Sequence, residues 1–127
     1  MYILRQPEQF RDTLKLVDKD GREQMVEISL KITPDMIKSY RQLQVKLHDL
    51  QNDSRAAEDK AEDMGRAVYA LLSLLFGEEN TDTILRFYDG DYTSLALDIF
   101  PYISDTIAPA LQADVKRRKA QYKRRAR

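Results

Sequence analysis

The residues of this chain that could do chemistry are few and scattered. The one histidine, His48, stands beside Asp49, and the chain has no cysteine. A zinc site needs three or four converging ligands, and the residues around His48 do not indicate a Ser-His-Asp arrangement. We therefore interpret His48 as a surface residue of a helix.

A cluster of carboxylates is the next candidate, because side chains at helical spacing can share one face. It comprises Glu58, Asp59, Glu62 and Asp63. Arg55, Lys60 and Arg66 interleave with it at the same spacing, which is typical of a solvated, partly self-paired helix face. The four glycines of the chain form no phosphate-binding loop of the Walker or dinucleotide type. We expect no catalytic, cofactor or metal residues and no enzymatic activity.

The carboxyl-terminal tail is the segment whose composition indicates a binding partner. Residues 116–127 (KRRKAQYKRRAR) hold eight of the 21 basic residues and no acidic one, which leaves −8 for the rest of the chain. The candidate binding cations are Lys116, Arg117, Arg118, Lys119, Lys123, Arg124 and Arg125. They could contact nucleic-acid phosphates while Tyr122 stacks on a base, but the acidic remainder would repel such a ligand. We expect folding to survive removal of this tail.

A long helix, predicted over residues 34–76, must position most of these side chains. Its heptad seam consists of Met36, Tyr40, Leu43, Leu47, Leu50, Ser54, Ala57, Ala61, Met64, Val68, Leu71 and Leu75. Such a helix would be roughly 65 Å long. The seam weakens in its middle, so a bend or break between Asn52 and Gly65 is an alternative, and the widened stripe at 67–76 is typical of a core.

The narrow part of the seam predicts a binding surface. Polar residues flank Tyr40, Leu43, Leu47 and Leu50, as in a coiled coil, and a chain this short leaves such a stripe exposed. We expect self-association through these four residues.

The elements around the long helix complete a single α+β domain over residues 1–127. Alternating apolar residues on both sides of Asp18-Lys19-Asp20-Gly21 predict a β-hairpin within 1–33 rather than a calcium loop, which would need further ligands. Its apolar face must lie on a helix, on a third strand at residues 2–4, or on another subunit. Shorter helices are predicted over 80–115, with Pro101 interrupting or kinking one of them. The fold is mainly α with an amino-terminal β-hairpin.

Length and composition narrow the class of protein. The chain has 127 residues, of which 43% are hydrophobic and 33% charged. No apolar run is long enough to span a membrane, and the amino end lacks the features of a signal peptide. We expect a cytoplasmic protein.

Three short stretches, in this order, carry a family resemblance: residues 74–80 (LLFGEEN), 84–92 (ILRFYDGDY) and 99–103 (IFPYI), followed by the basic end. With the preceding helix, residues 34–127 resemble small tail assembly chaperones of long-tailed phages and prophages of Gram-positive bacteria. The resemblance implies a non-enzymatic protein of the bacterial host cytoplasm that keeps the tape-measure protein in solution and recruits tail-tube subunits. A nucleic-acid-binding phage regulator and a purely structural coiled-coil protein are the alternatives.

Overall fold

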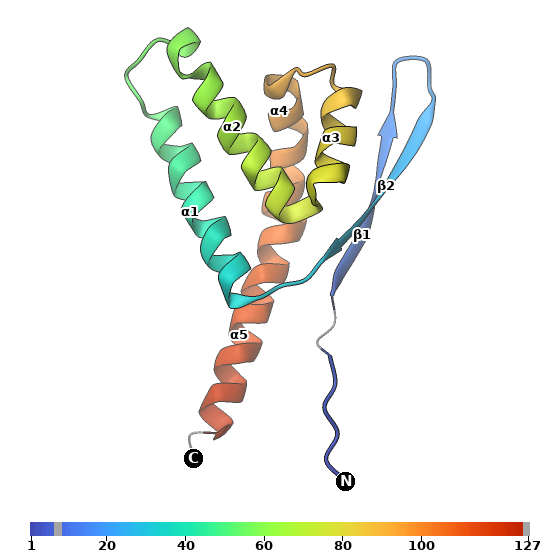
Figure 1. Cartoon of the computed structure of the whole chain (residues 1–127), viewed down its shortest axis with the longest axis vertical. Coiled ribbons are helices and arrows are strands. Elements are labelled where there is room, and N and C mark those ends of the chain that lie inside the picture. Colours follow the sequence, from blue (N-terminus) through green and yellow to red (C-terminus); the bar gives the residue numbers. More distant parts are fainter. Residues whose placement is uncertain (7–8, 126–127) are drawn as a thin grey trace.

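The computed structural model describes residues 1–6 and 9–125, with side chains described as far as Lys123. The last two residues of the basic tail, and the side chains of Arg124 and Arg125, lie outside this description. The elements in chain order are β1 (Phe10–Val17), β2 (Glu23–Leu30), α1 (Pro34–Gln51), α2 (Ala57–Phe76), α3 (Glu78–Phe87), α4 (Tyr92–Tyr102), a π-helical turn (Ile103–Ile107) and α5 (Ala108–Arg125). The predicted class, mainly helical with an amino-terminal hairpin, is confirmed (Figure 1).

The hairpin forms as its alternating pattern predicts. Strands β1 and β2 pair antiparallel from Phe10 opposite Leu30 to Val17 opposite Glu23. The connecting loop closes when the Asp18 carboxylate accepts the backbone N–H groups of Asp20 and Arg22, each at 2.9 Å. One face of the pair is apolar and lies on helices α2 and α3, whereas residues 1–6 form no third strand.

The predicted long helix is wrong in one respect, because two helices occupy residues 34–76. Helix α1 begins where expected, with the Thr33 hydroxyl accepting the N–H of Met36 at 3.1 Å. It ends at Gln51, and α2 begins at Ala57 and runs back beside α1 (Figure 1). Residues 52–56 form the turn, so the break lies within the interval that the weak seam marked. An antiparallel helix pair buries the same apolar stripe in half the length.

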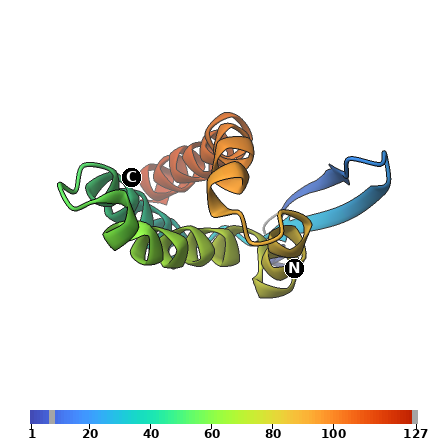
Figure 2. The ribbon, with the colours of Figure 1, turned by 90° about the horizontal axis from the view of Figure 1, so that it is seen from above.

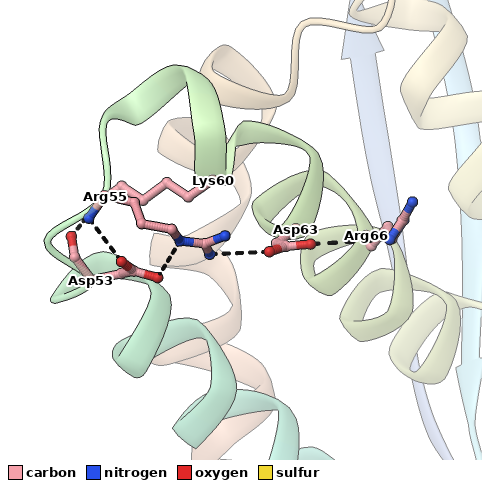
Figure 3. Close-up of polar contacts among 5 residues, drawn as sticks. All are labelled: Asp53, Arg55, Lys60, Asp63 and Arg66. Atoms are coloured by element: carbon pink, nitrogen blue, oxygen red, sulfur yellow. Dashed lines mark hydrogen bonds and ion pairs between the residues drawn. The ribbon is translucent and has the colours of Figure 1, made fainter.

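Polar contacts hold this turn in place (Figure 3). The Asp53 carboxylate accepts the backbone N–H and the Nε of Arg55, both at 2.8 Å. Arg55 also donates to Asp63 at 3.1 Å, and Lys60 donates to the Asp53 carbonyl at 3.2 Å. Arg66 approaches Asp63 from the next turn of α2 at 4.0 Å. Two of the three interleaved cations, Arg55 and Arg66, pair with Asp63 and Glu62 of the acidic cluster, which agrees with the expected partly self-paired face.

The remaining helices begin close to the predicted positions, but Pro101 does not end a helix. Helix α3 follows directly after Gly77, and the Asp91 carboxylate caps α4 by accepting the N–H of Ser94 at 3.1 Å. Proline has no N–H to donate to the carbonyl four residues earlier in the helix. Pro101 lies on the exposed side, where water can donate that hydrogen bond instead. The π-helical turn that follows, closed by the Ala108 N–H on the Ile103 carbonyl, continues directly into α5.

The core lies where the hairpin and α2 meet the segment formed by α4, the π-helical turn and α5. Its fully enclosed apolar side chains are Ile28, Leu72, Leu75, Ile84, Leu95 and Ile107. Seen from above, α4 and α5 lie behind the layer of α1 and α2, and the hairpin reaches out on the far side of α3 (Figure 2). The Asn80 amide ties α3 to the hairpin by donating to the Glu27 carbonyl at 2.9 Å. This arrangement leaves one side of α2 and one side of α4 facing each other across a groove.

Candidate partner-binding groove

The predicted binding stripe of α1 is already occupied by the chain itself. Tyr40, Leu47 and Leu50 are buried in the core, and Leu43 is half-buried against it. The expectation that these four residues stay exposed is wrong, because α2 folds back along α1 and covers them. Nothing in this arrangement tests self-association, but the stripe is not a free surface for it.

The basic tail is largely helical and partly structural. Its described part extends α5, where the buried carboxylate of Asp114 binds both Arg117 and Arg118, the latter at 2.6 Å. Arg118 also donates to the Ile32 carbonyl at 2.9 Å, joining α5 to the segment before α1. Lys116, Lys119 and Lys123 are exposed and available to a partner.

The groups first considered for chemistry do not converge on a site. The His48 side chain is 74% exposed, which confirms its surface assignment. Within residues 1–6 and 9–125, no group of three or more His, Cys, Asp or Glu side chains is placed to hold a metal ion.

A groove of about 860 Å³ lies between α2 and α4. One wall consists of Ala57, Lys60, Ala61, Met64, Gly65 and Val68 of α2. The other consists of Thr93, Ala96, Leu97, Phe100 and Pro101 of α4, with Ser104 beyond it. Both walls repeat the spacing of one helix face, three and four residues apart, so the groove runs along the two helices.

The chemistry of the groove is apolar with a thin polar margin. Leu97 is 72% exposed on its wall and adjoins the other apolar lining residues, and a contiguous apolar surface of this kind marks a binding site. At one end the ring of Tyr92 lies over α2 at Gly65, where a Cβ would make an ordinary 3.5 Å contact with the ring. Lys60 and Asp91 are the only charged side chains in the lining. Such a surface suits the apolar face of an amphipathic helix.

The sequence analysis missed this groove although two signals pointed to it. Ala57, Ala61 and Gly65 look like a weak seam, but small residues at helical spacing also leave room for a neighbouring element. Leu97 and Phe100 lie off the Leu95 and Ile99 stripe that enters the core. Apolar residues on two faces of one helix indicate two packing partners, of which the chain supplies one.

Comparisons with protein-family models, curated proteins and solved structures found no match for this chain. Among the helices in the described ranges, none combines the length and apolar character that crossing a membrane requires.

Proposed function

We propose that this protein is a non-enzymatic phage tail assembly chaperone, which holds an apolar-striped helix of the tape-measure protein in the groove between α2 and α4. It acts in the cytoplasm of the bacterial host. A tape-measure protein is long, helical and striped with apolar side chains, so before assembly its helices need temporary cover. A groove with apolar walls along two helices provides that cover.

The observation that carries the proposal is the apolar lining of the groove, in which Leu97 is exposed and Met64 and Phe100 are partly buried. Leu97, Met64 and Phe100 line a groove of about 860 Å³ that no described segment of the chain fills. Burying apolar surface stabilises a complex by roughly 25 cal/mol per Å² before the costs of association are subtracted. Because few charged groups line the groove, binding to it should depend little on salt.

The resemblance of residues 34–127 to tail assembly chaperones supports the same role. The second part of that role, recruiting tail-tube subunits, needs a surface that stays open while the groove is filled. The outer face of the hairpin, with Met25 and Val17 exposed, and the cationic end of α5 both lie outside the groove lining. The recruiting surface is one of these.

The test is to co-express the protein with helical fragments of the tape-measure protein encoded beside it, and to measure how much fragment stays soluble. The wild-type protein should keep at least one fragment in solution and co-purify with it at 0.5 M salt, a concentration of order several times physiological. Leu97→Glu places a charge on the exposed wall and should abolish this effect. Met25→Glu, at a 57% exposed apolar site on the hairpin, is the control and should leave it intact.

Two results would count against the proposal. One is a wild-type protein that leaves every fragment insoluble. The other is tight, steeply salt-dependent binding to duplex DNA with no affinity for the fragments, which would favour the nucleic-acid-binding alternative.

A further inference from the structure

A second hollow, of about 390 Å³, lies between α1 and α5, away from the groove of the proposed function. Its apolar floor is made by Pro34 and Ile37 of α1 and Val115 of α5. Its rim is cationic on both sides, with Lys38 and Arg41 on one helix and Arg118 and Lys119 on the other. No carboxylate lines it, although the chain outside residues 116–127 carries −8.

The four rim cations do not have equal roles. Arg118 is committed to Asp114 and to the Ile32 carbonyl, and so it fixes α5 against the start of α1. Lys38, Arg41 and Lys119 form no ion pair with any carboxylate among the described side chains. Lys38, Arg41 and Lys119 therefore face solvent around an apolar floor. Arg118 instead holds α5 against the segment before α1.

We propose that this cationic cleft binds an amphipathic acidic segment of a partner protein, with apolar side chains on the floor and carboxylates against Lys38, Arg41 and Lys119. Charge complementarity selects the partner, because like charges placed across an interface cost several kcal/mol whereas opposite charges speed and orient association. The site does not depend on the α2–α4 groove, and both can be filled at once.

The composition of the cleft favours a protein segment over nucleic acid. Phosphates would engage the cations but would leave Pro34, Ile37 and Val115 without an apolar contact. A segment that places leucines between glutamates satisfies both parts of the cleft.

The experiment uses the full-length protein and three probes. The first is a synthetic helical peptide of leucine and glutamate arranged in an amphipathic pattern, the second is the same composition scrambled, and the third is duplex DNA. Affinities are measured at low and physiological salt. We expect the patterned peptide to bind at least about tenfold more tightly than the scrambled peptide and than DNA, and to lose affinity as salt rises.

A matched pair of double variants locates the site. Lys38→Glu with Lys119→Glu reverses one rim charge on each helix and should weaken the patterned peptide at least about tenfold. Lys46→Glu with Lys123→Glu makes the same change in net charge on the same two helices outside the cleft, and should change affinity by less than about twofold. All four lysines are exposed or at the protein surface, so folding should survive in both variants.

Three outcomes would overturn the proposal. Equal losses in the two double variants would show attraction by net charge alone and would overturn the proposal. So would the absence of peptide binding, or tighter binding of DNA than of the patterned peptide. Since Leu97→Glu lies in the other groove, it should leave peptide binding unchanged, and a failure here is distinguishable from a failure of the chaperone role.

Discussion

The hydroxyl of Tyr102 on α4 donates a 2.7 Å hydrogen bond to Asp12 on β1, 90 positions earlier in the chain. Asp12 lies on the face of the hairpin that otherwise carries Phe10, Leu14 and Leu16. This bond from Tyr102, and then the backbone N–H of Thr13, hold the pKa of Asp12 below its usual value. This contact joins β1 to α4, as the Asn80 hydrogen bond to Glu27 joins β2 to α3.

Removing that hydroxyl should loosen the hairpin without disturbing the core. Tyr102→Phe keeps the ring, which meets Phe76 edge-on at 6.3 Å, and deletes only the hydrogen bond. We expect the free energy of unfolding to fall by about 1 kcal/mol, measured by urea denaturation. Tyr122→Phe, at a 75% exposed position, is the control. Equal stability of the two variants would show that Asp12 does not anchor the hairpin.

Truncating a buried core side chain should lower the free energy of unfolding more than removing the Tyr102 hydroxyl does. Leu72 is fully buried in α2, and Leu72→Ala should lower the free energy of unfolding by about 2 to 5 kcal/mol. Leu97→Ala removes the same atoms from an exposed site and should cost less than about 0.5 kcal/mol. Thermal denaturation of both variants checks the difference, and a costly Leu97→Ala would mean that the chain itself covers the groove.

The two arginines of the tail that bind Asp114 should matter for folding, contrary to the expectation from composition. Asp114 is 5% exposed, and replacing both Arg117 and Arg118 with alanine leaves its carboxylate without a partner. We expect a loss on the order of 2 to 3 kcal/mol. Lys119→Ala with Lys123→Ala removes the same charge from exposed sites and should be nearly neutral. Similar stability of the two double variants would place Asp114 outside the fold's essential contacts.

Alkaline pH should destabilise the protein through its tyrosines. Burial, and then the bond to Asp98, raise the pKa of Tyr88 from 10.0 to about 12. The unfolded chain therefore loses this proton first, so the stabilisation is complete below pH 10 and is lost as pH rises toward about 12. Denaturant titrations across that range should show a shallower pH dependence for Tyr88→Phe than for the wild type. Parallel pH profiles would contradict the raised pKa.

Local patterns were sufficient to predict the elements, because hairpin alternation and helix caps are short-range features. Helix α1 begins at the predicted residue 34, where Thr33 caps it, and the predicted turn at Asp18 closes the hairpin. Spacing alone could not show whether residues 34–76 form one helix or two, since a heptad stripe can pack against either a partner chain or a returning helix of the same chain. The break between α1 and α2 falls at Asn52, Asp53 and Ser54, because their side chains favour turns over helix interiors.

The candidate site was harder to predict than the fold. A groove depends on how far apart two helices lie, and the sequence states only which faces are apolar. The stripe at Leu47 and Leu50 looked free because the return of α2 was not foreseen. Leu95 and Leu97 are two positions apart in α4, yet Leu95 is fully buried and Leu97 is 72% exposed.

The most direct test of the central claim is hydrogen exchange of the full-length protein with and without a soluble tape-measure fragment. Binding in the α2–α4 groove should slow exchange in Ala57–Phe76 and Tyr92–Tyr102 while the hairpin amides exchange as before. The Leu97→Glu protein should show no such change. Protection confined to the hairpin or to α5, with α2 and α4 unaffected, would contradict the assignment of the groove as the partner-binding site.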